Sequence, residues 1–279
     1  MAYRTITTIL TDPEANLASM NAAMAVSRQV DAHLDVLCLG LDRSQPGFYY
    51  AGANAMVVQD NLAQAQSESV SLEDHARSML DGADFNWSAT GMTAQMVALN
   101  SLVAHRTRFS DLVVLPKPYG EGRGHDSEAV VEAALFNGGV PIMIAPDEGV
   151  FPEKVKNIVI AWNESAESLR AVRAALPFLQ EAENVSITII DPPQHGPERS
   201  DPGGSLSQML SRHGVRAEVS VLARTMPRIS DVLNRHVRDK DADMIVMGAY
   251  GHSRFRESIM GGATRHMLEV AEVPVLMAH

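Results

Sequence analysis

The sequence contains little that would tie it to a membrane or to an oxidising compartment. It holds a single cysteine, Cys38, so no disulfide can form within the chain. It has no run of about 18 or more apolar residues, the length that a membrane-spanning helix needs. Its first residues also lack the apolar stretch of a secretory signal peptide. We therefore expect a cytoplasmic protein with no membrane partner.

Basic residues are scarce and unevenly placed. The net charge of −11 argues against a nucleic-acid partner, because phosphate backbones bind Lys and Arg. Residues 1–148 hold 8 Lys and Arg against 18 Asp and Glu, whereas residues 149–279 hold 15 against 16. An anionic ligand is therefore expected in the second half.

Sequence patterns of common catalytic and metal sites are missing as well. The chain has no His-Glu-x-x-His, no Cys-x-x-Cys, no P-loop and no Gly-x-Ser-x-Gly. We predict no metal-binding residues and identify no catalytic residue.

The sequence does contain an internal repeat, which three pairs of segments mark in the same order. The pairs are RTITTILTDPEA (4–15) with KNIVIAWNESAE (156–167), SDLVVLPKPYG (110–120) with ADMIVMGAYGH (242–252), and GVPIMIAPDE (139–148) with EVPVLMAH (272–279). We place the two domains at 1–148 and 149–279. The first copy is longer by about 19 residues, which we assign to a long helix around 46–82.

Strands and helices alternate within each copy. In the second copy the apolar patterns predict strands at 156–162, 185–190, 216–222, 243–248 and 273–278, and helices at 165–180, 203–213, 227–239 and 262–271. Short apolar runs without alternation suit a parallel sheet that is covered on both faces. The predicted fold is therefore α/β, with two doubly wound, Rossmann-like parallel sheets in tandem, and ligands are expected beyond the carboxyl ends of the strands.

A glycine-rich stretch follows the strand at 243–248. Gly248 and Gly251 are separated from Gly261, Gly262, Ala263 and Thr264 by a loop, and a helix follows. Backbone amides at a helix start form an anion site, for which phosphate is a common ligand. Glycines after a strand also form plain turns, and spacing alone does not separate the two interpretations.

This stretch resembles the nucleotide-binding signature of the universal stress protein family, Gly, two residues, Gly, nine residues, Gly. The turn AWNES at 161–165 also resembles that family's first-strand turn, where Asp-Gly-Ser is usual. The resemblance covers the second copy well and the first copy mainly through its ends and the order of its elements.

The resemblance implies an adenine-nucleotide site in the second copy, with ATP or AMP as ligand and Mg²⁺ accompanying ATP. Ala161, Trp162 and Asn163 would hold base and ribose, with Asn163 in place of the usual Asp, and Ile189 or Ile190 would pack on the adenine. The diphosphate turn would be lined by Met247, Gly248, Tyr250 and Gly251. The outer phosphates would be held by Gly261, Gly262, Ala263 and Thr264.

The first copy departs from this signature. Pro116 and Pro118 stand at the strand end, where prolines remove two N–H donors. Asp126 and Glu128 stand at the following helix start, where carboxylates repel phosphate. We therefore interpret the first domain as a degenerate member and predict one nucleotide per chain.

The functions that remain open belong to three classes. The first is a stress-response regulator or sensor that binds the nucleotide with little or no hydrolysis, at most a weak ATPase. The second is a chaperone-like or scaffolding protein whose first half binds a partner or another small ligand. The third is a slow phosphohydrolase, with His252 as the one candidate base. The closing segments 140–145 and 273–278 are expected to pair as an intramolecular pseudo-dimer, and association of two chains into a homodimer stays open.

Overall fold

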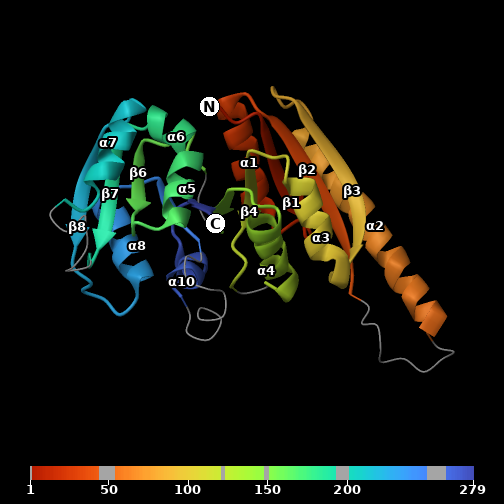
Figure 1. The fold of residues 1–279 in the computed structure, drawn as a ribbon. Coiled ribbons are helices and arrows are strands. Elements are labelled where there is room, and N and C mark those ends of the chain that lie inside the picture. Colours follow the sequence, from red (N-terminus) through yellow and green to blue (C-terminus); the bar gives the residue numbers. More distant parts are fainter. Residues whose placement is uncertain (1, 44–53, 121–122, 148–150, 193–200, 250–261) are drawn as a thin grey trace. The chain divides into compact units, whose positions relative to one another are not determined.

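The apolar runs that the sequence predicts as strands form mostly parallel sheets in the computed structural model, which describes residues 2–43, 54–120, 123–147, 151–192, 201–249 and 262–279. The chain divides into two compact units, Tyr3–Val140 and Pro141–His279. Strands and helices alternate along both units (Figure 1). The protein is thus an α/β protein with two Rossmann-like sheets.

The unit Tyr3–Val140 contains four strands in a parallel sheet of order β3-β2-β1-β4. Its elements are β1 (Thr5–Leu10), α1 (Leu17–Val30), β2 (His33–Asp42), α2 (Asn54–Leu80), β3 (Trp87–Gln95), α3 (Met96–Thr107), β4 (Leu112–Pro116), α4 (His125–Glu132) and the π-helical turn η1 (Ala133–Asn137).

The unit Pro141–His279 contains six strands in the order β5-β10-β9-β6-β7-β8. Its elements are β5 (Ile142–Ala145), β6 (Asn157–Ala161), α5 (Ala166–Ala174), α6 (Leu176–Glu181), β7 (Asn184–Ile190), α7 (Gly204–Arg212), β8 (Ala217–Leu222), α8 (Ile229–Asp239), β9 (Met244–Gly248), α10 (Ala263–Val270) and β10 (Val275–Ala278). All neighbouring pairs are parallel except β5 with β10.

The same aspartate contact anchors the first strand of each unit. Asp111 Oδ2 accepts hydrogen bonds from the backbone N–H groups of Arg4 and Thr5, at 2.7 and 3.0 Å. Asp243 Oδ2 accepts the equivalent bonds from residues 156 and 157, at 2.7 and 2.9 Å. Arg4 and Asp111 are 107 residues apart and the second pair 87, so the first unit is longer by 20 residues over this stretch.

The extra length lies largely in one helix. α2 has 27 residues and occupies the place that the 9-residue α7 has in the other unit, between the second and third strands. It packs closely on β2, since a Cβ added to Gly40 would lie 1.8 Å from the backbone oxygen of Ala65. Only glycine allows this approach.

One predicted helix is divided in two. The sequence predicts a single helix over 165–180, whereas the structure has α5 and α6 with a break at Ala175. Pro177 explains the break, because its missing N–H and fixed φ favour the first turn of a new helix over the interior of an old one.

The two closing strands pair with each other. β5 runs antiparallel to β10, with Met143 opposite Leu276. This pairing places β5 in the unit Pro141–His279, so the compact units divide at 140/141, whereas the boundary predicted from the repeat is 148/149. No helix within the described ranges is long and apolar enough to cross a bilayer.

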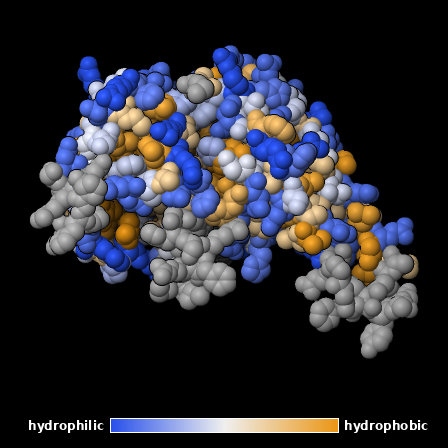
Figure 2. Space-filling model, in the orientation of Figure 1, coloured by the Kyte–Doolittle hydropathy of each residue, from blue (hydrophilic) through white to orange (hydrophobic). Residues whose placement is uncertain are grey.

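The start of α2 exposes apolar side chains, which contribute to the hydrophobic surface along that helix (Figure 2). Met56 is 75% exposed, and Val57, Val58 and Leu62 are 38 to 41% exposed. An exposed apolar cluster on a helix is typical of a contact surface.

Candidate functional site

A small pocket lies at the carboxyl end of the sheet in the unit Pro141–His279. Its volume is about 120 Å³, and it is lined by Ala161, Trp162, Asn163, Thr188, Ile190, Ile229, Leu233, Met247, Gly248 and Ala263. The order of the strands reverses between β6 and β9, with β7 and β8 on one side and β10 on the other. A doubly wound sheet binds its ligands at such a reversal, so this pocket is the candidate site.

Six of the predicted site residues line this one pocket. They come from the end of β6, the end of β9 and the start of α10, and are Ala161, Trp162, Asn163, Met247, Gly248 and Ala263. Tyr250, Gly251 and Gly261, together with His252, lie outside the described residues.

Ile189 is not among the residues that line the pocket, and Ile190 takes the place expected of it. The two side chains point to opposite faces because successive residues of a strand alternate. Ile189 lies instead on the face toward α7, where its Cδ1 would be 3.1 Å from a Cβ added to Gly203. Of these two residues of β7, Ile190 is the one that lines the pocket.

The turn after β6 is held by local hydrogen bonds. The backbone N–H of Trp162 donates to the carbonyl of Thr188, at 2.9 Å. Asn163 Oδ1 accepts from the backbone N–H of Ser165, at 3.2 Å, and Ser165 Oγ caps α5 by accepting from the N–H of Ser168, at 3.1 Å. Asn163 is exposed and lines the pocket, and its amide N–H groups are able to donate to a ligand.

Glu164 occupies the position where the family's turn has glycine, and it adopts a left-handed backbone conformation with φ of 61°. A residue with a side chain is strained by about 1 kcal/mol there. Such strain is often found in turns that form binding sites.

Gly248 has a packing role that the sequence does not reveal. A Cβ added to it would lie 2.5 Å from the backbone nitrogen of Ser168 and 2.8 Å from the backbone carbon of Glu167. The end of β9 therefore touches the first turn of α5 directly. The glycine is explained by this helix contact, whether or not a phosphate also approaches it.

The start of α10 contributes less than the sequence predicts. Gly262 precedes the helix and Ala263 lines the pocket, whereas Thr264 is only 4% exposed and already has an interaction within the protein. Thr264 is not among the residues that line the pocket, and its predicted contact with a phosphate stays a prediction. The predicted role of Ala263 agrees better with its position than that of Thr264.

Three lining residues were missed in the sequence. Thr188 comes from β7, and Ile229 and Leu233 come from α8. The spacing of Ile229 and Leu233, one helical turn, is a signal for a helix face that packs on the sheet. The sequence could not show that this face also reaches the ligand pocket.

A row of polar side chains runs under α8 away from the pocket. Ser186 Oγ lies 3.3 Å from Thr188 Oγ1, 3.0 Å from Ser220 Oγ and 3.3 Å from His236 Nε2. Burial, and then the nearby charge of Lys240, lower the pKa of His236. The imidazole is therefore neutral at pH 7 and is part of the packing between α8 and the sheet.

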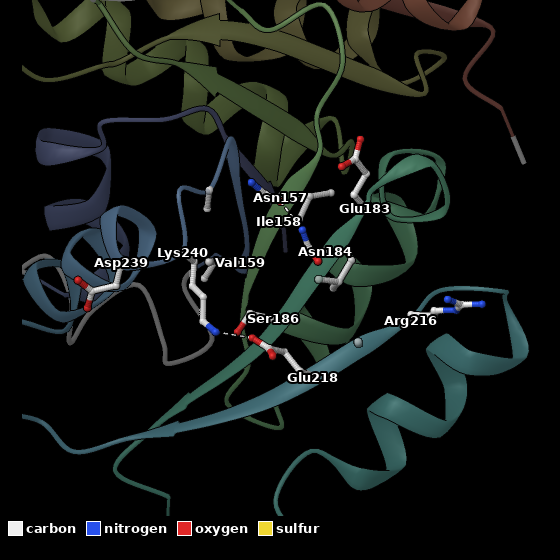
Figure 3. Close-up of a pocket in the computed structure, with 13 residues that line it drawn as sticks. Asn157, Ile158, Val159, Glu183, Asn184, Ser186, Arg216, Glu218, Asp239 and Lys240 are labelled. Carbon is white, nitrogen blue, oxygen red and sulfur yellow. Dashed lines mark hydrogen bonds and ion pairs between the residues drawn. The ribbon is translucent and has the colours of Figure 1, made fainter.

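A larger groove, of about 670 Å³, lies at the opposite, amino ends of β6, β7 and β8 (Figure 3). Several of its polar groups already have partners. Lys240 Nζ lies 2.5 Å from Glu218 Oε1, and Asn184 Nδ2 donates to Asn157 Oδ1 at 2.8 Å. Its place at the amino ends of the strands and its paired side chains make it a weaker candidate than the smaller pocket.

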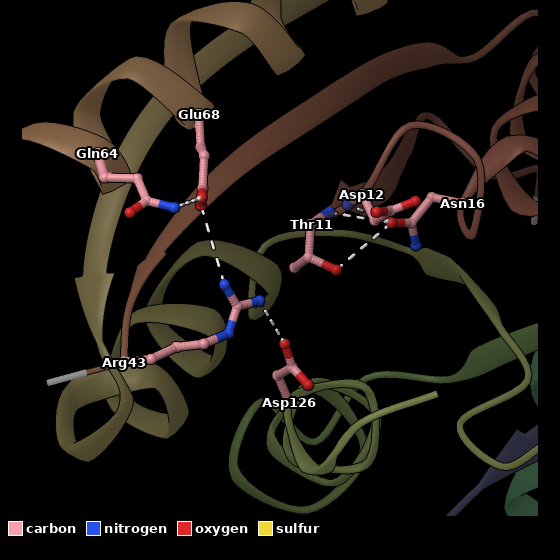
Figure 4. Close-up of polar contacts among 7 residues, drawn as sticks. All are labelled: Thr11, Asp12, Asn16, Arg43, Gln64, Glu68 and Asp126. Atoms are coloured by element: carbon pink, nitrogen blue, oxygen red, sulfur yellow. Dashed lines mark hydrogen bonds and ion pairs between the residues drawn. The ribbon is translucent and has the colours of Figure 1, made fainter. Parts of the chain in front are cut away.

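In the matching region of the unit Tyr3–Val140, several polar side chains contact one another (Figure 4). Asn16 Oδ1 accepts from the backbone N–H groups of Thr11 and Asp12, both at 3.0 Å. Arg43 lies between two acidic side chains, 2.8 Å from Asp126 and 3.9 Å from Glu68. Tyr119 donates to Glu128 at 2.8 Å.

These contacts occupy the carboxylates at the start of α4, the helix that corresponds to α10. Pro116 ends β4 where Gly248 ends β9. Within the described residues, no group of three or more His, Cys, Asp or Glu side chains is arranged to hold a metal ion.

Comparisons with known proteins agree with this architecture. The family model of the Universal stress protein family matches residues 154–279. A universal stress protein of Synechocystis sp. is 26% identical over 209 residues, which cover 66% of this chain and 67% of that protein.

Solved structures match the fold over nearly the whole chain. A universal stress protein from Archaeoglobus fulgidus superposes with a TM-score of 0.70 at 12% identity, over 98% of this chain and 95% of its own. A functionally unknown protein from Pseudomonas aeruginosa superposes with a TM-score of 0.56 at 14% identity, over 99% and 92%. The second half of the chain thus matches the universal stress protein family, and the chain as a whole shares the fold of such proteins.

Proposed function

We propose that the unit Pro141–His279 binds an adenine nucleotide, ATP or AMP, and that the protein is a cytoplasmic stress-response regulator whose output depends on this occupancy. One observation supports the proposal above the others. Residues from 161–163, 247–248 and 263, far apart in the sequence, line one pocket at the point where the strand order reverses. The names of the relatives support the stress-response role.

The walls of the pocket suit a flat base. Ile190, Leu233 and Met247 provide apolar contacts, and Asn163 provides an amide that can donate to a ribose hydroxyl. The start of α10 would lie toward the phosphates, where the positive end of the helix dipole favours an anion.

Hydrolysis is expected to be slow or absent. None of the described residues that line the pocket is an Asp, Glu, His or Lys, so none of them can serve as a general base. Since these lining residues also include no carboxylate, Mg²⁺ would be held chiefly by the phosphate oxygens of ATP.

The direct test is calorimetric titration of the full chain with ATP and AMP. We expect one site per chain. Ala263→Asp should weaken binding by about a hundredfold, because a carboxylate in the pocket repels phosphate, while Asp in a first helical turn is tolerated. The matched control is Ala129→Asp in α4, which should leave affinity unchanged. Wild-type protein that binds neither nucleotide would overturn the proposal.

A second candidate function, a chaperone-like or scaffolding role for the first half, is favoured by the exposed apolar side chains at the start of α2. Its test is suppression of the aggregation of a heat-denatured reference protein. The double variant Met56→Asp, Leu62→Asp should abolish that suppression if the role is real. Equal suppression by wild type and variant would contradict it.

The pairing of β5 with β10 also supports the proposal that the two domains form an intramolecular pseudo-dimer. Under this proposal the edge of β10 is covered within one chain. Light scattering after size exclusion, over a range of protein concentrations, would test whether two chains associate further.

A further inference from the structure

The indole of Trp162 presents an unused hydrogen-bond donor beside the candidate pocket. Trp162 lines the pocket, and its Nε1 is buried with no hydrogen-bond partner among the described residues. An indole N–H can only donate. A buried donor without an acceptor lowers stability, so a native protein retains one where something else supplies the acceptor.

Among the described residues that line the pocket, the side-chain acceptors are already engaged. The carbonyl of Thr188 accepts from the backbone N–H of Trp162, and the Thr188 hydroxyl lies 3.3 Å from Ser186 Oγ. Asn163 Oδ1 accepts from Ser165. The remaining lining side chains have no oxygen or nitrogen, namely Ala161, Ile190, Ile229, Leu233, Met247, Gly248 and Ala263.

A ligand that suits these walls has a flat apolar body and an acceptor at its edge. Branched and thioether side chains contact the faces of a ring, and the N–H of Trp162 requires an atom with a lone pair in the plane of that ring. A purine meets both demands, because its ring nitrogens N1, N3 and N7 are acceptors set in a flat aromatic body.

We propose that the Nε1–H of Trp162 donates a hydrogen bond to a ring nitrogen of the bound purine, so that Trp162 is a residue that determines specificity for the base. This rests on the proposed nucleotide-binding function. The role does not depend on charge and complements Asn163, which is exposed and lines the pocket. Contacts to the phosphates or the ribose alone would not distinguish one base from another.

The test combines one variant with three nucleotide analogues. Trp162→Phe keeps an aromatic ring and removes the donor. The analogues 1-deaza-, 3-deaza- and 7-deaza-ATP each replace one ring nitrogen by C–H. We expect wild-type protein to bind one of them about five- to tenfold more weakly than ATP, the effect of one net hydrogen bond. Trp162→Phe should bind ATP more weakly by the same factor and should not distinguish ATP from that analogue.

Trp87 in β3 provides the matched control. Trp87→Phe changes the only other tryptophan and should leave every affinity unchanged. It also leaves Trp162 as the sole indole, so that its fluorescence reports directly on ligand binding. Thermal melts verify that both variants are folded, and the analogue series in wild-type protein remains decisive if Trp162→Phe does not fold.

The outcomes separate this inference from the proposed function. If ATP binds to wild-type protein and all three analogues bind equally well, the donor does not contact the base, and the inference is overturned while the proposed function stands. Equal ATP affinity of wild type and Trp162→Phe would overturn it in the same way. A wild-type protein that binds no nucleotide would instead overturn the proposed function, and the inference with it.

Discussion

The turns that follow the first strand differ between the two units in how fully their polar groups are used. After β1, Asn16 and Asp12 together accept hydrogen bonds from four backbone N–H groups, those of residues 11, 12, 14 and 15. After β6, Asn163 accepts one, from Ser165, and Trp162 Nε1 has no described partner. The polar groups of the first turn are paired with one another, whereas the indole N–H of the second turn has no partner among the described residues.

The two turns also differ in backbone strain, which is found only in the turn after β6. Glu164 in the second turn is left-handed, while no residue from 11 to 16 in the first turn has a positive φ. In the turn after β1 the backbone adopts no left-handed conformation, and its backbone N–H groups at residues 11, 12, 14 and 15 already donate to side chains of the same turn. The comparison teaches that two units with the same order of strands can differ in how many polar groups of this turn have partners within the protein.

The largest effect is expected from Gly248→Ala. The added Cβ would meet the backbone of Ser168 and Glu167 in α5, which cannot move without displacing that helix. We expect unfolding to become easier by about 2 kcal/mol, within the range for overpacked sites, and ATP binding to be lost. Urea denaturation and calorimetry would measure both.

A matched control is available in a glycine with open surroundings. A Cβ added to Gly214 meets nothing within 4 Å, although its φ of +81° makes alanine strained by about 1 kcal/mol. Gly214→Ala should therefore destabilise less and should leave ATP binding intact. Equal behaviour of the two variants would remove the packing explanation for Gly248.

A pH effect should be confined to the unit that carries the pocket. Because burial and Lys240 lower the pKa of His236, with Asp239 and Glu218 acting in the opposite direction, the unfolded chain takes up a proton at higher pH than the folded one. Stability from the neutral imidazole is full above about pH 6.5 and is lost as pH falls through the lower folded pKa. Urea midpoints measured between pH 7.5 and 5 should show this fall.

His236→Gln should flatten that pH dependence, since glutamine keeps a hydrogen-bonding group beside Ser186 and does not titrate. His105→Gln, at an exposed position of α3, is the control and should leave the profile as in wild type. An unchanged profile in His236→Gln would show that other groups cause the acid instability.

A smaller and favourable effect is expected from Asn163→Asp. The aspartate usual in the family accepts charge-assisted hydrogen bonds from ribose hydroxyls, which are stronger than those of an amide by about 1 kcal/mol. ATP affinity should rise about fivefold by calorimetry. Thr11→Asp, at the corresponding strand end of the other unit, should give no second site, and a measured stoichiometry of two would contradict the contrast between the turns.

The smallest effect is expected from Arg43→Ala. Its partly exposed ion pairs with Asp126 and Glu68 contribute at most about 1 kcal/mol. We expect a slightly lower melting temperature and still one nucleotide per chain, because Asn16 continues to hold the turn after β1. Appearance of a second ATP site would show that Arg43 alone closes the first pocket.

The sequence predicted the order of strands and helices well, because buried apolar runs and turn residues are local signals. It placed residues 161–163, 247–248 and 263 in one site, because carboxyl ends of parallel strands meet at one edge of a sheet. It left Ile189 and Ile190 as alternatives for this position, since a strand that is buried on both faces shows no alternation of apolar and polar residues that would say which side chain faces the pocket.

Other features depend on tertiary packing that no local pattern encodes. The contact of Gly248 with α5 and the place of Leu233 over the pocket follow from how helices rest on the sheet. The roles predicted for Tyr250, Gly251 and Gly261 stay predictions.

The antiparallel pairing of β5 with β10 means that the repeat in the sequence is a poor guide to where the protein can be cut. A fragment that begins at residue 149 would contain the whole family match and the whole pocket, yet it would lack β5. The backbone N–H and C=O groups on that side of β10 would then be unpaired, and this exposed edge strand could pair with a strand of another chain. The residues before the apparent start of the second domain include the strand that covers this edge of β10, so a fragment of that domain should begin before Ile142.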